Sequence, residues 1–180
     1  NKYLGEVTIS DAFSNSLNTV AVDLLDKVGF KDVIAMANRL GVGNSTPLGH
    51  YYSLAIGACE ETLLNMTGAY AAIANRGIYI TPSPFEEIRG SNGSIIWERE
   101  LNKRKPVRAL SRNIADTLNW MLQEAVAEGT GIAAALKNRA VAGKTGTSEG
   151  SRDLWFIGSL PQLTTGVWFG YDNNSNTNSG

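Results

Sequence analysis

The spacing of apolar residues predicts helices in the first part of the chain. From 10 to 28 the apolar positions recur at helical intervals, and Val20, Leu24 and Leu25 resume one face after a polar interruption. Similar patterns occupy 32–40, 63–76 and 112–128. Each pattern is followed directly by a glycine, which suits the left-handed end of a helix. Between them, 41–52 is rich in Gly, Asn, Ser and Pro and is predicted as a loop.

Short runs of β-branched and aromatic residues predict strands, most of them near the end of the chain. They lie at 78–80, in a hairpin within 85–100 that turns at Asn92-Gly93, around Val141, and at 154–160 and 163–170. Helices followed by consecutive strands with short turns indicate an α+β fold with an antiparallel sheet.

Composition narrows the class of protein. With 180 residues, 43% of them hydrophobic and 18% charged, the chain suits one globular domain or most of one. A net charge of −1 argues against a nucleic-acid partner, and the basic cluster at 99–108 is expected to be a solvated loop. Cys59 and His50 are the single residues of their types, so neither a disulfide framework nor a metal site is expected, and no cofactor is implied. No apolar run is long enough to span a bilayer.

The segment Ala142-Gly143-Lys144-Thr145-Gly146-Thr147 carries the strongest chemical signal. A cation, two hydroxyls and glycines without side chains suit a bound carboxylate or phosphate. A phosphate-binding P-loop would need a glycine at 138 and a following helix. Residue 138 is Asn, however, and 154–157 has a strand pattern. A P-loop nucleotide binder therefore remains only an alternative hypothesis.

Lys144-Thr145-Gly146 also resembles the Lys-Thr-Gly element of serine acyl-transferases, which accompanies a Ser-x-Asn triplet, and the chain contains two such triplets. Ser111-Arg112-Asn113 opens a helical pattern, so Ser111 is predicted to be its N-cap. Ser16-Leu17-Asn18 interrupts a helical pattern instead, and a break of this kind can project a hydroxyl and an amide into a cleft. The alternative is that Asn18 merely caps the second helix.

Motifs along most of the chain then resemble one family. Ser16-Leu17-Asn18, the helix at 66–77, Glu128-Gly129-Thr130-Gly131, the Lys144 segment and 153–158 occur in the order found in the C-terminal part of the class A penicillin-binding protein transpeptidase domain. This family belongs with the β-lactamases among the serine acyl-transferases. The resemblance implies an α+β fold with an antiparallel sheet, flanking helices and a helical subdomain, incomplete in this chain. It covers 1–172 and leaves 173–180 as a polar tail that we expect to be mobile.

The resemblance also implies a reaction, the cross-linking of peptidoglycan stem peptides ending in D-Ala-D-Ala through a serine acyl-enzyme that β-lactams also form. It implies that Ser16 relays a proton, that Asn18 holds the substrate amide, and that Lys144 provides positive potential. It assigns substrate binding to Thr145, Gly146 and Thr147, the Thr147 N–H being half of the oxyanion hole. Residues 129–131 are interpreted as a helix C-cap and a tight turn, not as catalytic.

The family's nucleophile is missing from this polypeptide, because no serine is followed by a lysine three positions later. We therefore expect a partner chain or an upstream segment with Ser-x-x-Lys, and no turnover by this chain alone. The resemblance places the protein on the extracytoplasmic face of a bacterial membrane, anchored by a segment outside this sequence, and often with an upstream glycosyltransferase domain. A non-catalytic relative that binds peptides is the third hypothesis.

Overall fold

A computed structural model of the chain describes residues 4–98 and 105–177. Three helices come first, and two longer ones follow at the centre of the chain. They are α1 (Ile9–Ser14), α2 (Asn18–Val28), α3 (Phe30–Arg39), α4 (Leu63–Ala74) and α5 (Arg112–Ala127), with short 3₁₀ turns η1 (Tyr52–Ile56), η2 (Ile132–Ala134) and η3 (Glu149–Ser151). The predicted helices are confirmed, although α3 begins at Phe30 instead of at 32.

Side-chain caps fix the starts of the two central helices. The Thr62 hydroxyl accepts a hydrogen bond from the Asn65 amide at 3.1 Å, at the beginning of α4. The Ser111 hydroxyl accepts from the Ile114 amide at 3.4 Å, at the beginning of α5. Each cap satisfies an amide that has no partner within its helix. Ser111 is therefore a structural serine, as the sequence predicted.

The main sheet has three antiparallel strands in the order β5-β6-β7, namely β5 (Ala142–Thr147), β6 (Asp153–Leu160) and β7 (Leu163–Gly170). This confirms the α+β prediction, with β5 beginning one residue after Val141. Lys144 pairs with Ile157 and Thr147 with Leu154, so β5 pairs with β6 alone and forms one edge of this sheet. A second small sheet joins β1 (Ile78–Tyr79) to β4 (Val107–Arg108). The sequence reading missed β4, because it placed these residues in a basic loop.

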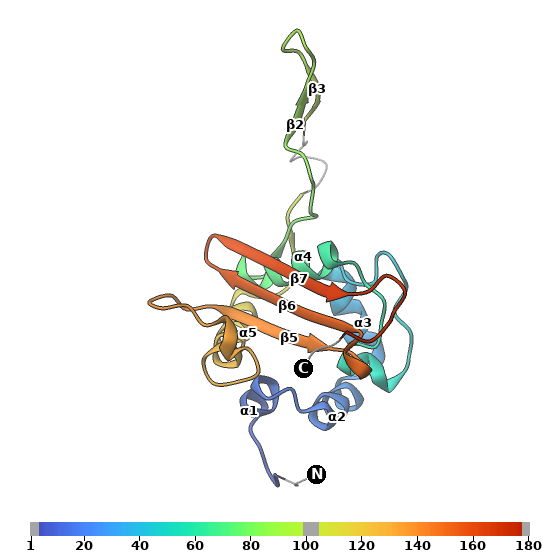
Figure 1. Cartoon of the computed structure of the whole chain (residues 1–180), viewed down its shortest axis with the longest axis vertical. Coiled ribbons are helices and arrows are strands. Elements are labelled where there is room, and N and C mark those ends of the chain that lie inside the picture. Colours follow the sequence, from blue (N-terminus) through green and yellow to red (C-terminus); the bar gives the residue numbers. More distant parts are fainter. Residues whose placement is uncertain (1–3, 99–104, 178–180) are drawn as a thin grey trace.

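Helices α4 and α5 cover one side of the main sheet (Figure 1), with α5 against β5 and α4 against β6 and β7. Gly166 on β7 permits this close approach, because a Cβ there would overlap the Thr67 hydroxyl of α4. The buried face of α5 is made of small and aliphatic side chains, Ala115, Leu122, Ala125 and Val126. The site described below lies at the β5 edge of this layer.

The opposite side of the sheet is open over β7. Leu163 and Phe169 are each 61% exposed, and Val167 is exposed as well. An apolar sheet face of this kind is normally packed against a further element of the same domain. The fold is thus the α+β arrangement expected from the sequence, with one sheet face uncovered by the described residues.

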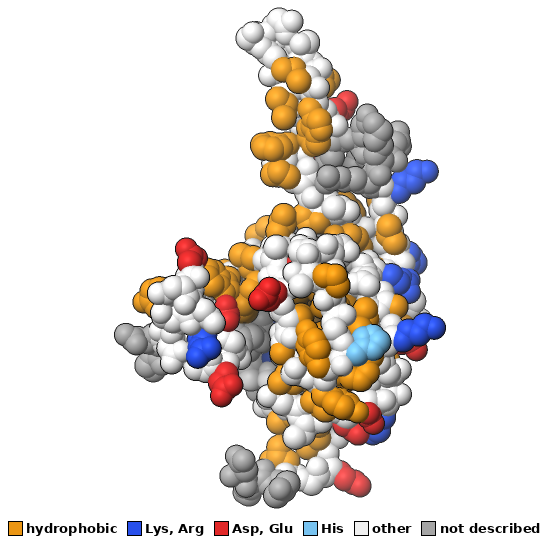
Figure 2. Space-filling model, turned by 90° about the vertical axis from the view of Figure 1, so that its right-hand side faces the viewer, with side chains coloured by type: hydrophobic (Ala, Val, Ile, Leu, Met, Phe, Trp, Pro, Cys, Tyr) orange, Lys and Arg blue, Asp and Glu red, His pale blue; other side chains and the backbone are white. Residues whose placement is uncertain are grey.

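A hairpin of β2 (Glu87–Arg89) and β3 (Ile95–Glu98) projects far from the rest of the molecule (Figure 1). Its turn contains Asn92-Gly93, as predicted, with Gly93 at φ 78°. Apolar side chains gather along the projection (Figure 2), and Ile96 is 69% exposed.

The last described residues return to the turn at η3. The Thr177 amide donates to the Ser151 carbonyl oxygen at 3.2 Å, and the Thr177 hydroxyl also donates to this oxygen. Mobility of the tail stays a prediction, and 178–180 lie outside the described residues, as does 99–104 of the basic cluster. Within the described ranges, none of the helices is both long and apolar enough to cross a membrane.

Candidate active site

The break between α1 and α2 presents Ser16 at the surface. Ser16 lies in the left-handed region at φ 53°, and the Leu17 amide donates to the Ala12 carbonyl at 2.9 Å to close the turn. Helix α2 then begins at Asn18, with Leu17 in the N-cap position and no side-chain cap. The alternative that Asn18 caps this helix is therefore wrong. The exposed side-chain amide of Asn18 makes no hydrogen bond to the described residues and is available to a ligand.

Lys144 on β5 reaches across to this break. Its ammonium donates a hydrogen bond to the Ser16 hydroxyl and lies 3.4 Å from the Thr130 hydroxyl and 3.4 Å from the Thr145 carbonyl oxygen. Burial lowers the pKa of Lys144 below the usual lysine range, because removing water from an ammonium favours its neutral form. The structure therefore brings the Ser-x-Asn and Lys-Thr-Gly elements into direct contact.

The Thr147 amide points to the free edge of β5. The Ser148 amide donates to the Asp153 carbonyl at 3.0 Å, which makes these two residues a hydrogen-bonded pair. In an antiparallel ladder such pairs alternate with unbonded ones. Thr147, which pairs with Leu154, is thus in an unbonded pair, and its N–H faces away from β6. An amide in this position is free to donate to an oxyanion.

Thr145 and Gly146 complete the strand's polar edge. The hydroxyl oxygens of Thr145 and Thr130 are 2.8 Å apart. A Cβ on Gly146 would lie 3.3 Å from the Trp155 Cβ and would narrow the space beside the strand. A peptide can therefore approach the backbone closely at this position.

Thr130 is a site residue that sequence reasoning missed. The interpretation of 129–131 as a helix end and turn was correct for the backbone, since the Gly131 amide donates to the Ala125 carbonyl at 2.9 Å. The Thr130 side chain nevertheless lies between Lys144 and Thr145. A hydroxyl between two glycines was the available signal, but its partners are distant in sequence.

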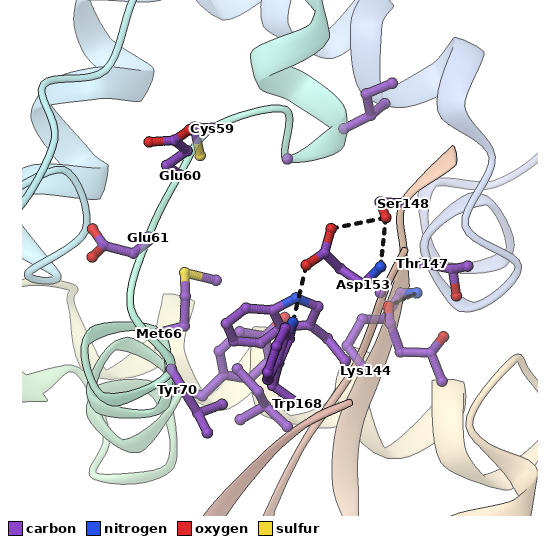
Figure 3. Close-up of a pocket in the computed structure, with 17 residues that line it drawn as sticks. Cys59, Glu60, Glu61, Met66, Tyr70, Lys144, Thr147, Ser148, Asp153 and Trp168 are labelled. Atoms are coloured by element: carbon purple, nitrogen blue, oxygen red, sulfur yellow. Dashed lines mark hydrogen bonds between the residues drawn. The ribbon is translucent and has the colours of Figure 1, made fainter. Parts of the chain in front are cut away.

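Asp153 anchors the turn that follows β5. The Ser148 hydroxyl donates to one carboxylate oxygen at 3.0 Å, and the Trp168 indole N–H on β7 donates to the other at 3.0 Å (Figure 3). The Asp153 amide donates back to the Ser148 hydroxyl at 2.7 Å. This network fixes the chain immediately after Thr147.

A cavity of about 610 Å³ opens beside the strand (Figure 3). Its walls come from β5, β6, α4 and residues 56–61, and are largely apolar at Met66, Trp155 and Ile157. Tyr70 also lines it, and burial raises the Tyr70 pKa to about 12. Cys59 is half-buried in this wall; burial, and then the charge of Glu61, raise the pKa of its thiol. Apolar walls next to Lys144 suit a packed chain segment better than a hydrated ion.

Glu61 holds one wall of the cavity in place. Its carboxylate accepts from the Gly43 amide at 2.6 Å, from the Thr62 amide at 2.8 Å and from the Asn65 side-chain amide at 2.8 Å. Burial would raise the pKa of Glu61, but these hydrogen bonds outweigh it and lower the pKa below the usual range. The ionised carboxylate thus joins the loop after α3 to the start of α4.

The geometry contradicts the nucleotide hypothesis. Lys144 lies within a strand, and the chain continues into η3 and then β6. A P-loop needs a helix N-terminus directly after the lysine, where amides and helix dipole meet the phosphates.

An antiparallel sheet whose edge strand brings Lys-Thr-Gly against a Ser-x-Asn helix break defines the class of serine acyl-transferases. A sequence model of the penicillin binding protein transpeptidase domain matches residues 1–180. The chain belongs to this family.

Penicillin-binding protein 1A of Aquifex aeolicus is 41% identical over 171 residues, which are 95% of this chain and 23% of the relative. The chain thus spans about a quarter of that relative's length. Penicillin-Binding Protein 1A from Haemophilus influenzae shares the fold, with a TM-score of 0.84 at 24% identity over 97% of this chain and 31% of that chain. Penicillin binding protein 3 from Mycobacterium tuberculosis, solved in complex with aztreonam, matches with a TM-score of 0.71 at 28% identity, over 85% of this chain and 42% of that chain.

Proposed function

We propose that the chain supplies the proton-transfer and substrate-binding half of a peptidoglycan D,D-transpeptidase site. The observation that carries this proposal is the hydrogen bond from Lys144 to Ser16 across 128 sequence positions. It brings the edge strand with Lys-Thr-Gly against the helix break with Ser-x-Asn, and these are the two motifs that accompany the serine nucleophile in this family. Membership of the family supports the same reaction.

Ser16 and Lys144 act together on the leaving amine. A serine hydroxyl both accepts and donates, so Ser16 can pass its proton to the departing nitrogen and take a proton in its place from the Lys144 ammonium, which donates to its oxygen. Burial of Lys144 brings its pKa closer to neutral pH, which favours proton transfer. The exposed Asn18 amide holds the substrate backbone and orients the lysine of the missing Ser-x-x-Lys element.

The β5 edge binds the acyl donor. The hydroxyls of Thr145 and Thr147 receive the terminal carboxylate, and Lys144 supplies the positive charge that attracts it. Gly146 leaves room for the peptide to lie along the strand. The outward-facing Thr147 N–H donates to the oxyanion of the tetrahedral intermediate, together with the amide of the missing serine.

The nucleophile comes from outside this sequence, on an upstream segment or a partner chain that carries Ser-x-x-Lys. The apolar cavity of about 610 Å³ beside Lys144 has the position and character to receive a helix with this motif. The chain alone then has no residue to acylate and is inactive.

The substrates are stem peptides ending in D-Ala-D-Ala, and β-lactams occupy the same site as their mimics. The aztreonam complex of the M. tuberculosis relative supports the β-lactam part of this proposal. Because peptidoglycan lies outside the cytoplasm, the domain faces the extracytoplasmic side of a bacterial membrane, held there by a segment outside this sequence. Hydrolysis of the acyl-enzyme, a D-Ala carboxypeptidase reaction, competes with transfer when no amine is bound.

The test uses the full-length protein with a fluorescent penicillin. We expect covalent labelling of one serine, competition by a stem peptide ending in D-Ala-D-Ala, and weaker competition by the same peptide ending in L-Ala-L-Ala. Mass spectrometry with an amine-bearing acceptor peptide should detect a cross-linked product. Absence of labelling would contradict an acyl-transferase and favour the non-catalytic relative. Labelling of this chain in isolation would show that the nucleophile is misassigned.

A further inference from the structure

Thr130 lies within the site, but the proposed reaction gives it no role. Its hydroxyl oxygen is 2.8 Å from that of Thr145 and 3.4 Å from the Lys144 ammonium nitrogen. Its backbone amide donates to the carbonyl oxygen of Ser14 at 3.1 Å, at the end of α1. Thr130 therefore contacts both the Lys-Thr-Gly strand and the helix break that carries Ser16.

The backbone of this turn is built for close approach to α1. A Cβ on Gly129 would overlap the Ser14 carbonyl oxygen, so a glycine at 129 lets the next amide reach this oxygen. The Gly131 amide then closes the turn on α5 through the Ala125 carbonyl at 2.9 Å. Main-chain hydrogen bonds to α1 and α5 thus fix the backbone at Thr130 and Gly131.

The donors and acceptors allow a direction through these hydroxyls that leaves the Thr145 proton free, although either of the two hydroxyls has the groups to be the donor. A lysine ammonium can only donate, so the Thr130 oxygen must accept from Lys144. The single Thr130 proton is then free to donate to the Thr145 oxygen, 2.8 Å away. When Thr130 donates in this way, the Thr145 oxygen accepts and its own proton is left for an anion in the cleft.

We propose that Thr130 is a positioning residue that orients the Thr145 hydroxyl toward the carboxylate of the substrate and ties this strand to the Ser16 turn. This inference rests on the proposed acyl-transferase function and assigns a role within the same site. Thr130 does not touch the reacting atoms. It acts through Lys144 and Thr145.

The experiment measures the second-order rate constant for acylation of the full-length protein by a fluorescent penicillin. T130V keeps the shape and the backbone contacts but removes the hydroxyl, and we expect it to slow acylation about tenfold. T130S retains the hydroxyl and should remain within about twofold of the native protein. T117V is the matched control, because the Thr117 hydroxyl donates to the Asn113 carbonyl within α5, away from the site.

A double-mutant cycle with T145V separates positioning from a merely structural role. If Thr130 acts through Thr145, T130V should cost clearly less in the T145V background than alone, because coupled residues are not additive. Equal costs in both backgrounds, native rates in T130V, or equally slow T130V and T130S would each overturn the proposal. If T130V lowers the unfolding midpoint by more than about 5 °C, T130A and T130S are compared in its place by the same criteria. Failure of the native protein to label would instead refute the proposed function.

Discussion

The Lys144 ammonium donates a hydrogen bond to the Ser16 hydroxyl, joining an edge strand to a helix break 128 positions earlier in the chain. Ser16 reaches it because the chain turns through a left-handed residue at φ 53° between α1 and α2. Lys144 reaches it because β5 has no neighbouring strand on that side within the described structure. The contact distinguishes this serine from the second Ser-x-Asn serine, Ser111, which caps α5.

The two Ser-x-Asn serines should respond differently to alanine. Ser16→Ala in the full-length protein should lower the penicillin acylation rate constant about a hundredfold, because the proton relay is lost. Its thermal unfolding should be unchanged. Ser111→Ala should leave acylation unchanged and destabilise the domain by about 1 kcal/mol through loss of a helix cap. The opposite pattern, measured by labelling and thermal unfolding, would show that the wrong triplet was assigned.

The decline of the acylation rate at alkaline pH should depend on Lys144. Burial lowers its pKa, so the ammonium is lost at a pH below the usual lysine value of about 10.4. Acylation should therefore decline as the pH rises toward that value, since the neutral amine no longer supplies positive charge. Rates measured from about pH 7 to about pH 10.5 would show the decline.

Lys144→Arg provides the control for this pH dependence. A guanidinium stays protonated throughout this range, so the part of the decline that belongs to Lys144 should disappear. The rate at neutral pH should still fall, because the planar group fits the Ser16 contact poorly. The same alkaline decline in both proteins would assign it to another group.

Asp153 should support catalysis without touching the substrate. The Ser148 hydroxyl and the Trp168 indole each donate to one carboxylate oxygen of Asp153, and Asp153→Asn replaces one of these oxygens with an NH₂ group that can only donate. The turn after β5 then loosens, and the Thr147 N–H is held less well for the oxyanion. We expect acylation about tenfold slower and a changed tryptophan fluorescence spectrum. Asp32→Asn, on the exposed side of α3, is the matched control and should change neither.

Glu61 should stabilise the cavity wall in a pH-dependent way. Its folded pKa is lowered, so the ionised form stabilises the fold above the ordinary glutamate pKa of about 4.3, and this contribution is lost as the pH falls through the folded value. Glu61→Gln should raise the hydrogen-exchange rates of the Gly43 and Thr62 amides about fivefold at pH 7. This corresponds to a loss of about 1 kcal/mol of local stability after solvent screening is taken into account.

The difference between Glu61→Gln and the native protein should shrink at acid pH, as the pH falls through the lowered folded pKa of Glu61 and the native carboxyl group also becomes neutral. The neighbouring exposed residue provides the control, and Glu60→Gln should exchange like the native protein at both pH values. An effect of Glu61→Gln that stays equally large at low pH would assign it to shape and not to charge.

Local sequence patterns predicted most of the elements because their signals are local. Helical periodicity, the cap at Ser111, and the strands at 154–160 and 163–170 depend on neighbours within a few positions. Strand β4 was missed because two residues, Val107 and Arg108, carry no alternation, and their pairing with β1 is a tertiary event.

The contact between Lys144 and Ser16 could be predicted because each residue belongs to a motif, whereas contacts that no motif marks were missed. Lys144 and Ser16 belong to recognisable triplets, so their partnership could be inferred before any geometry was known. Thr130 and Asp153 could not be assigned in this way. Thr130 acts through hydroxyl contacts to Lys144 and Thr145, and Asp153 acts through Trp168 on another strand. A local sequence pattern does not show contacts between residues so far apart in the chain.

A double-mutant cycle on Ser16 and Lys144 tests the central claim most directly. The acylation rate constant of the full-length protein is measured for Ser16→Ala, Lys144→Ala and the pair. If the two side chains work as one unit, the double variant should be about as slow as the slower single variant. Independent effects whose fold-losses multiply in the double variant would contradict a shared acyl-transfer site.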